Sequence, residues 1–267
     1  MIGSRVVACK ICGSDSELLL EGTVLKRHSV RYYRCGKCEL VQTEDPHWLA
    51  EAYREPINAT DTGYVDRNIE CARLTKSLIT LLRKESGCFV DYGGGYGLFV
   101  RMMRDLGFDF RLSDKFCPNL FARGFEASSG TQTKYDLLTA FEVFEHLPNP
   151  QEEMTRMLEL SDSFFFSTVL APLDRDEFAR WEYLGFEHGQ HVSFYTFKTL
   201  QELASSHGLF LCSNFWNFHL FSKRPVSPRM FRLAISARGS RLVSALFHRP
   251  SFRDTDYQSI KKKLLSD

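Results

Sequence analysis

The spacing of apolar residues changes several times along the middle of the chain, and each change predicts a new element. Apolar residues recur at helical spacing from about Tyr64 to Lys84. The apolar run "FVDY", residues 89–92, then leads through glycines into "LFVRMMRDLG", which has the pattern of another helix. Three later runs, "FDFRLS", "YDLLTA" and "SDSFFFSTVL", have the length of strands. Strands that alternate with helices predict an α/β fold with a doubly wound, Rossmann-like parallel sheet that binds ligands at the carboxyl ends of its strands.

The N-terminal region combines short β-like runs, "ELLLEGTVL" and "VRYYRC", with two Cys-x2-Cys pairs. A glycine follows the first pair at Gly13 and interrupts the second at Gly36. The pairs are 22 residues apart and consist of Cys9, Cys12, Cys35 and Cys38. This pattern predicts a zinc ribbon of about four strands, in which four thiolates hold a structural Zn²⁺. The alternatives are two disulfides or four ordinary buried thiols. The remaining cysteines have no such spacing.

The composition is that of an ordinary globular protein, with 43% hydrophobic and 25% charged residues in a chain of 267. We expect one main domain with a small appendage. The sequence contains no run of about 18 apolar residues, and its N-terminus lacks the apolar stretch of a signal peptide. These features predict a cytoplasmic protein with mostly reduced cysteines.

Charge is distributed unevenly, although the net charge is only +1. Residues 223–267 carry +8, which leaves −7 on the first 222 residues. The stretch "SPRMFRLAISARGSRLVSALFHRP" predicts a basic amphipathic helix that is interrupted near Gly239. Such a helix lies on an anionic membrane surface or near nucleic acid, or packs on the body with its arginines in solvent. We expect residues 251–267 to be partly disordered.

The glycine-rich segment carries the first candidate chemistry. Asp91 ends an apolar strand, and Gly93, Gly95 and Gly97 follow at alternate positions before the predicted helix. A strand that delivers glycines to a helix N-terminus exposes backbone amides to a polar ligand. The pattern resembles the first motif of the class I S-adenosylmethionine-dependent methyltransferases. That resemblance implies that the strand-terminal acid and the glycine loop hold the amino-acid portion of S-adenosylmethionine.

Later segments match the same family. Asp114 ends the next strand 23 residues after Asp91, where the family presents an acid to the ribose hydroxyls; the alternative is a cap on the following helix. Phe116 is placed to lie against the adenine, or belongs to the core. The segment "FEVFEHLPNP" is similar to the family's loop after the fourth strand, and the resemblance implies that Glu142 binds the cofactor and that His146 matches the family's histidine.

A second polar cluster lies in "WEYLGFEHGQHVSFYTFKTLQELA", before a helix that Thr196 is expected to cap. In zinc-ribbon methyltransferases that act on nucleotide-linked deoxysugars, two histidines that resemble His146 and His191 flank the acceptor. A methyl transfer needs alignment of donor and acceptor and removal of a proton, which an imidazole can accept. We therefore expect His191 or His146 as the base, with Glu187 orienting a histidine or binding a sugar hydroxyl. His188 is expected to be structural.

The resemblance covers residues 9–221 and predicts three parts: a zinc ribbon over 1–45, an S-adenosylmethionine-binding domain over 46–222 and a basic helical tail over 223–267. It implies methylation of a sugar or glycan precursor. The second large domain of the deoxysugar C-methyltransferases has no counterpart here, so we expect O-methylation. An RNA base methyltransferase is one alternative, but an acidic body disfavours nucleic acid as a partner. A non-catalytic zinc-ribbon binding protein is another.

Overall fold

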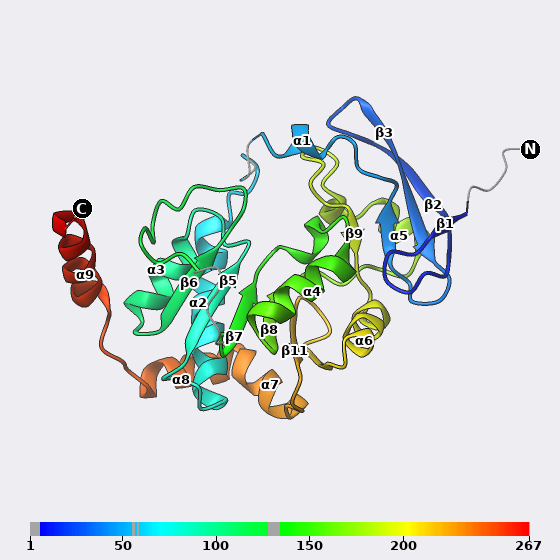
Figure 1. The fold of residues 1–267 in the computed structure, drawn as a ribbon. Coiled ribbons are helices and arrows are strands. Elements are labelled where there is room, and N and C mark those ends of the chain that lie inside the picture. The colour runs from blue at the N-terminus through cyan, green and yellow to red at the C-terminus, as the bar shows by residue number, and fades with distance from the viewer. Residues whose placement is uncertain (1–5, 55–56, 58, 128–133, 267) are drawn as a thin grey trace, which may run out of the picture. The chain divides into compact units, whose positions relative to one another are not determined.

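The structure is a computed structural model that describes residues 6–54, 57, 59–127 and 134–266. Its contacts divide the chain into two compact units (Figure 1). The first unit comprises Met1–Asn58, Glu142–Leu158 and Phe166–Pro225. The second unit comprises Ala59–Phe141, Glu159–Phe165 and Val226–Asp267. The predicted division at residues 45 and 222 stays a prediction.

The first unit contains a five-stranded antiparallel sheet in the order β1-β2-β3-β4-β9. Its strands are β1 (Val7–Ala8), β2 (Asp15–Val24), β3 (His28–Cys35), β4 (Val41–Thr43) and β9 (Ser193–Phe194). Strands β2 and β3 confirm the two β-like runs between the cysteine pairs. The buried core on this sheet includes Val30, Tyr32, Trp48 and Phe178. Strand β9 joins from far along the chain, so the sheet is larger than the predicted ribbon.

Helices and a hairpin complete the first unit. They are α1 (Leu49–Ala52), the 3-10 turns η1 (Phe144–His146) and η2 (Glu182–Leu184), α5 (Arg175–Ala179), α6 (Phe197–Ser206), β10 (Phe210–Ser213) and β11 (Phe218–Ser222). Helix α4 (Pro150–Leu160) and strand β8 (Ser163–Ser167) are shared between the units. The Thr196 cap is confirmed, because its side chain accepts from Thr199 N and completes a capping box.

The second unit carries the predicted strand, glycine loop and helix. Helix α2 (Tyr64–Leu81) precedes β5 (Cys88–Tyr92), α3 (Leu98–Asp105), β6 (Asp109–Ser113) and β7 (Leu137–Ala140). The strand order is β8-β7-β5-β6, and β5 pairs in parallel with both β6 and β7. Phenylalanines fill its core: the Phe89 and Phe110 rings stack with centroids 5.0 Å apart, and the Phe99 ring meets Phe110 edge-on at 5.4 Å. This part of the predicted α/β fold is confirmed.

The prediction of a wholly parallel sheet is wrong at one end. In the first unit the order is β10-β11-β8, and β10 pairs antiparallel with β11. Only residues 214–217 connect these two strands. A connection of that length forms a hairpin, whereas a parallel pair needs a crossover of a dozen residues or more. The sheet is therefore mixed.

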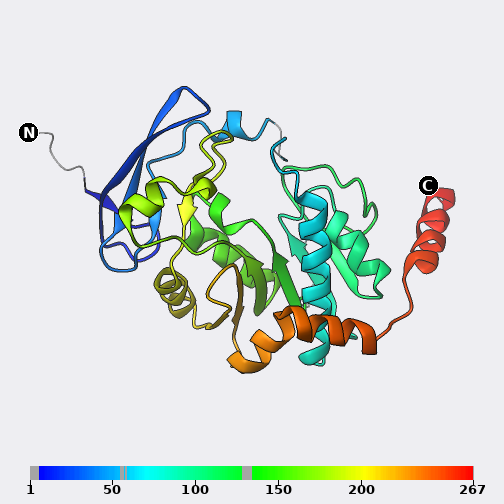
Figure 2. The ribbon, with the colours of Figure 1, turned by 180° about the vertical axis from the view of Figure 1, so that it is seen from behind.

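The C-terminal region of the second unit is helical throughout α7 (Pro228–Ile235), α8 (Ala237–Leu246) and α9 (Arg253–Ser266) (Figure 2). The break falls at Ser236, whose side chain accepts from Gly239 N, and so Gly239 lies inside α8. The expected disorder of residues 251–267 is wrong for α9, because the Asp256 carboxylate accepts hydrogen bonds from Arg104 at 2.7 and 2.8 Å. Helices α7 and α8 pack on α2, as one of the alternatives for the tail required.

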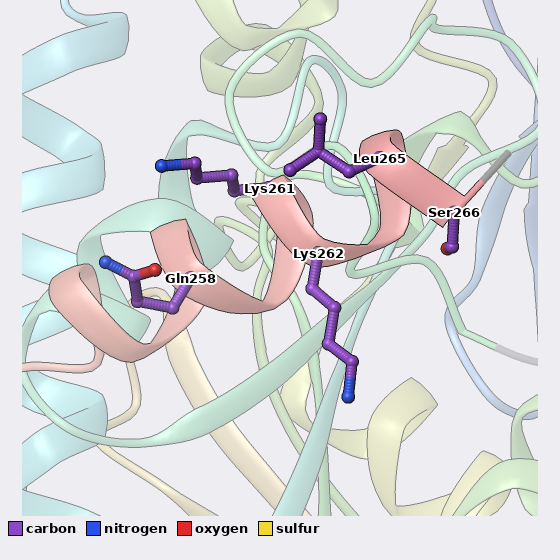
Figure 3. A pocket seen from close by; sticks show the side chains of 5 residues that line it. All are labelled: Gln258, Lys261, Lys262, Leu265 and Ser266. Carbon is purple, nitrogen blue, oxygen red and sulfur yellow. The ribbon is translucent and has the colours of Figure 1, made fainter.

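Helix α9 also borders the hollow drawn in Figure 3. Its lining residues are Gln258, Lys261, Lys262, Leu265 and Ser266. All five belong to the same helix, so the hollow is a flank of α9 and defines no binding site. Among the described residues, no helix combines the length and apolar composition that crossing a membrane requires. The cytoplasmic location stays a prediction.

Candidate active site

The loop after β5 has the backbone that only glycine adopts easily. Gly93, Gly95 and Gly97 have φ angles of +67°, +58° and +84°. These values lie in the left-handed region, where a Cβ atom is disfavoured. The loop then enters α3, whose N-cap is Gly97. All three predicted glycines are therefore needed for the turn that brings backbone N–H groups to the helix start.

Gly94 is a further essential residue that the alternating pattern passed over. A Cβ atom at this position would lie 2.1 Å from Asp91 Oδ2 and 2.7 Å from Leu112 Cδ1. The Asp91 carboxylate thus lies so close to the loop that a residue larger than glycine does not fit at position 94. The run of three consecutive glycines in "DYGGGYG" was the available signal.

Asp91 is almost fully buried at the end of β5, with 2% of its surface exposed. Burial raises the pKa of its carboxyl to about 7, against an opposing hydrogen bond from Thr139 and with a further upward effect of the nearby Asp114 charge. The Thr139 Oγ1 donates to Asp91 Oδ1 at 2.6 Å. A cationic group bound at this carboxyl would favour its ionised form. The site therefore suits a positively charged ligand such as an ammonium group.

Asp114 ties the loop to the end of β6. Its Oδ2 accepts from Gly95 N at 2.9 Å, and its Oδ1 accepts from Phe116 N and Cys117 N at 2.7 Å each. Asp114 thus caps the turn at residues 114–117. This role is close to the predicted alternative, in which Asp114 caps the following helix. Phe116 is 70% exposed, which excludes a core role for its ring. Contact with an adenine stays a prediction.

The first unit gathers the candidate bases. His191 Nδ1 lies 2.6 Å from the backbone oxygen of Tyr183. A carbonyl can only accept, so Nδ1 carries the proton and the lone pair of the neutral ring is on Nε2. Burial lowers the pKa of His191, with smaller opposing effects from that hydrogen bond and from the charges of Glu142 and Glu187. His191 is therefore a neutral imidazole near pH 7.

His146 lies beside His191, with the two ring centroids 4.8 Å apart and nearly perpendicular. Its Nδ1 is hydrogen-bonded to the Tyr53 hydroxyl at 2.9 Å. The sequence offered no sign of Tyr53, because 93 residues separate it from His146. A carboxylate oxygen of Glu145 and one ring nitrogen each of His146 and His191 lie within 4.8 Å of one another. The two predicted histidines are thus brought together by the fold.

Glu145 and Tyr183 hold this histidine pair together. The fully buried Glu145 accepts through Oε1 from the Tyr183 hydroxyl at 2.6 Å. The Glu145 backbone oxygen accepts from Val192 N at 2.8 Å. Glu145 of η1 is therefore bonded to Tyr183, which precedes His191 in the chain, and to Val192, which follows it. The contacts of Tyr183 with Glu145 and His191 are those of a positioning residue.

The other predicted residues of this cluster have lesser contacts. Glu187 is exposed, and its charge has the smallest of the four effects on the pKa of His191. His188 Nδ1 accepts from Gln190 N at 3.1 Å and its ring packs on Gly185, which fits the structural role. The Glu142 Oε1 accepts from Ser167 Oγ at 2.6 Å, and the residue adopts a φ of +52°. Its side chain is thus fixed within the first unit, and its predicted cofactor contact stays a prediction.

The N-terminal cysteines form a compact group of four free thiols. Their sulfur atoms lie within 4.8 Å of one another, with Cys9 to Cys38 at 3.4 Å and Cys12 to Cys35 at 3.5 Å. Tetrahedral Zn²⁺ with bonds of about 2.3 Å places its sulfurs about 3.8 Å apart. Backbone N–H groups of Lys37 and Cys38 also point at Cys35 Sγ at 3.4 Å. The donor set therefore fits a zinc ion.

The parallel strands, glycine loop and terminal acids described above are typical of the class of α/β proteins that bind a ligand at the carboxyl ends of their strands. A protein-family model described as a methyltransferase domain matches residues 65–213, which is more than half of the chain. The chain belongs to this methyltransferase family, and it is an S-adenosylmethionine-dependent methyltransferase. No curated protein matches the sequence significantly.

Several solved structures are similar to parts of the chain. The plantazolicin methyltransferase BpumL in complex with a pentazolic desmethylPZN analog and SAH has a TM-score of 0.47 and 13% identity, covering 75% of this chain and 90% of that one. A possible histamine N-methyltransferase from Thermotoga maritima has a TM-score of 0.42 and 12% identity, covering 67% and 100%. CalO1, a methyltransferase in calicheamicin biosynthesis in its SAH-bound form, has a TM-score of 0.38 and 15% identity, covering 66% and 61%.

Proposed function

We propose that this enzyme methylates a hydroxyl group of a sugar or glycan precursor and that His191 accepts the hydroxyl proton. The observation that carries the proposal is the hydrogen bond from His191 Nδ1 to the Tyr183 carbonyl at 2.6 Å. It leaves the lone pair on Nε2, which is the form a general base needs. Burial lowers the pKa of His191, so the base is available at neutral pH.

Asp91, the loop of residues 93–97 and Asp114 would hold the cofactor. When bound, S-adenosylmethionine supplies an activated methyl group on a sulfonium. The buried Asp91 would accept from the ammonium group of the amino-acid portion, and Asp114 would accept from the ribose hydroxyls. Because Asp114 already bonds Gly95 N, one side chain would connect the shape of the loop to ribose binding.

The first unit would orient the acceptor and take up its proton. When His191 Nε2 receives the proton, the ring becomes an imidazolium and its Nδ1–H bond to Tyr183 strengthens. The buried Glu145 carboxylate, whose donor atom lies within 4.8 Å of that of His191, would stabilise this positive charge. His146, fixed by Tyr53, would bind the acceptor or relay the proton, and Glu187 would bind a sugar hydroxyl at the exposed side.

Two features support a sugar hydroxyl as the acceptor. The cysteine ribbon and the "GQHVSFYT" loop occur together, as in the sugar methyltransferases that the sequence resembles. A neutral imidazole with a lowered pKa is a weak base. Such a base can remove a hydroxyl proton while the methyl group is transferred, but it is poorly matched to forming a carbanion first. These points favour O-methylation over C-methylation.

We also propose that Cys9, Cys12, Cys35 and Cys38 bind one structural Zn²⁺. Four sulfur ligands complete a tetrahedral site and leave no position for a substrate. The ion would close the N-terminal strands β1 to β3 into one unit, since their ends carry all four ligands. Its contribution would be to folding, separate from methyl transfer.

Transfer from isotope-labelled S-adenosylmethionine tests the proposal. Nucleotide sugars with glycan intermediates and total RNA are incubated separately, and products are identified by mass spectrometry. We expect label on a sugar oxygen. Label on carbon would overturn O-methylation, and label in RNA alone would overturn the sugar acceptor.

Two variants assign the roles of the residues. His191→Gln should keep cofactor affinity in calorimetry while turnover falls by roughly 10²- to 10⁴-fold, the usual contribution of a general base. Asp91→Ala should abolish cofactor binding. Wild-type turnover in His191→Gln would show that another group accepts the proton.

A further inference from the structure

Helices α7 and α8 have two different faces. Inside the second unit, Phe231, Ala234, Ile235 and Val243 are buried, and both helices pack on α2. Figures 1 and 2 show α7 and α8 against α2 from opposite sides. Lys76 Nζ also donates to the Ser244 backbone oxygen at 3.4 Å. The orientation of α7 and α8 on α2 is therefore fixed by buried side chains, which determines what they present outward.

The outward face is apolar as well as basic. Four large apolar side chains are at least half exposed: Leu233 at 57%, Leu242 at 61%, Leu246 at 66% and Phe247 at 50%. Leu242 and Leu246 are one helical turn apart, and Arg238 precedes Leu242 by one turn, so the three residues form one stripe along α8. Exposure of such a stripe to water is unfavourable, because burying apolar surface stabilises a protein by about 25 cal/mol for each Å².

The same face has no acidic residue. Residues 226–253 contain six arginines and neither Asp nor Glu. Arg229, Arg232, Arg238 and Arg241 are exposed, and within the described residues none of these four forms an ion pair. The positive charge of this surface is thus not neutralised by the unit that carries it.

We propose that the outward face of α7 and α8 binds an anionic lipid bilayer, with Leu233, Leu242, Leu246 and Phe247 inserted at the headgroup boundary and the arginines on lipid phosphates. Each basic residue near an anionic membrane surface contributes about 1 kcal/mol, and inserted apolar side chains add the hydrophobic term. Nucleic acid would use the arginines but would leave the leucines in water, because its outer surface is phosphate and sugar. This surface goes beyond the proposed function and does not depend on it.

The location of the apolar residues fits an interfacial rather than a spanning mode. Each helix is short, with eight residues in α7 and ten in α8. Helices of that length are too short to span a bilayer, which needs about 20 residues, and an amphipathic helix can instead lie in the plane of the interface with its apolar face inserted. Their other face is already packed on α2, so the second unit would rest on the membrane through this pair.

Vesicle co-sedimentation of the full chain tests the proposal. Vesicles of phosphatidylcholine alone are compared with vesicles containing about one third phosphatidylserine, at low salt and at about 0.5 M salt. We expect binding only to the anionic vesicles, and at least tenfold weaker binding at high salt, where the Debye length is a few ångströms.

Two matched variants locate the surface. Leu242→Glu/Leu246→Glu should weaken binding at least tenfold, whereas Leu18→Glu, which changes a leucine 47% exposed on β2, should bind like the wild type. Arg238→Gln/Arg241→Gln should lose binding while leaving the leucines in place. Unfolding midpoints close to the wild type show that these surface variants are folded.

Two results would overturn the proposal. One is a wild-type protein that does not bind anionic vesicles at low salt. The other is equal vesicle binding by wild type and Leu242→Glu/Leu246→Glu. Binding of an RNA or DNA duplex without vesicle binding would assign the face to nucleic acid instead. Methyl transfer measured without vesicles is independent of all these outcomes.

Discussion

His191 donates its Nδ1 proton to the backbone oxygen of Tyr183, and the two rings lie with their centroids 4.6 Å apart. Tyr183 therefore controls His191 through its main chain, while its hydroxyl reaches Glu145 on the other side. His191, which is the proposed base, is thus linked through Tyr183 to the buried Glu145 carboxylate. A substitution that removes the Tyr183 hydroxyl should therefore alter the position of His191, although the histidine itself is retained.

Tyr183→Phe should lower kcat while leaving cofactor affinity unchanged. The variant removes the 2.6 Å hydrogen bond to the buried Glu145 carboxylate and keeps the backbone acceptor of His191. Loss of a partner to a buried group costs about 1–3 kcal/mol in unfolding free energy. Tyr32→Phe is the control, since the buried Tyr32 hydroxyl has no hydrogen-bond partner among the described residues. Equal kcat values in both variants would argue against a positioning role.

The pKa of Asp91 predicts how stability depends on pH. The unfolded chain releases this proton near pH 4, but burial in the folded state raises the pKa to about 7. Between these values the folded state binds more protons, so its stability falls as pH rises through the window. The difference between 3.8 and about 7 corresponds to roughly 4 kcal/mol, as an upper limit.

Asp91→Asn should remove that pH dependence, because an amide does not ionise and can still accept from Thr139. Denaturant unfolding at pH 5 and pH 8 measures it. We expect the variant to be more stable than the wild type at pH 8 and closer to it at pH 5, while cofactor binding is lost. An unchanged difference between the two pH values in the variant would mean that another group titrates.

Loss of the proposed zinc ion should destabilise the N-terminal strands. Cys38→Ser should lower the bound zinc from about one equivalent to none, measured by elemental mass spectrometry, and should lower the unfolding midpoint. Cys212→Ala is the control, because Cys212 is buried in β10 and is not one of the clustered thiols. Full zinc content in Cys38→Ser would contradict the four-sulfur site.

Local patterns predicted the strand, glycine turn and helix around Asp91, and long-range contacts explain what the patterns missed. The strand, glycines and helix around Asp91 follow one another in sequence, so spacing alone located them. Tyr53 approaches His146 only through the fold, and the role of Tyr183 depends on Glu145, 38 residues away. The sequence could not reveal either contact.

In the C-terminal region, local sequence predicted less order than the structure has. Gly239 suggested a helix break, but the helix starts before it because Ser236 provides the cap. A Cβ atom at Gly239 would lie 2.0 Å from the Leu233 oxygen, so glycine serves a close approach there. The polar composition after position 251 suggested disorder. An ion pair with residues about 150 positions earlier orders it instead.

That ion pair supports the last prediction. The Asp256 carboxylate is only 8% exposed, and it pairs with Arg104 at 2.7 Å and Arg101 at 2.9 Å. Burial alone would raise the pKa of Asp256, but the hydrogen bonds and charges of the two arginines outweigh it and lower the pKa. The stability that this pair contributes is present above the ordinary carboxyl pKa and is lost as pH falls through the lowered value.

Asp256→Asn should therefore destabilise the protein by about 1.5–3 kcal/mol at pH 7, because the buried Arg104 loses its charge-assisted hydrogen bonds to Asp256 and keeps Asp109 as its ionic partner. Asp254→Asn is the matched control two residues away, where the carboxylate is 90% exposed and, among the described residues, pairs with the exposed Arg253 alone. A surface pair of that kind contributes about 0–1 kcal/mol.

Denaturant unfolding with proteolysis of the C-terminus measures both variants. Because Asp256 attaches α9 to α3, we expect cleavage within residues 253–266 to accelerate in Asp256→Asn alone, and equal cleavage in both variants would show that other contacts hold α9.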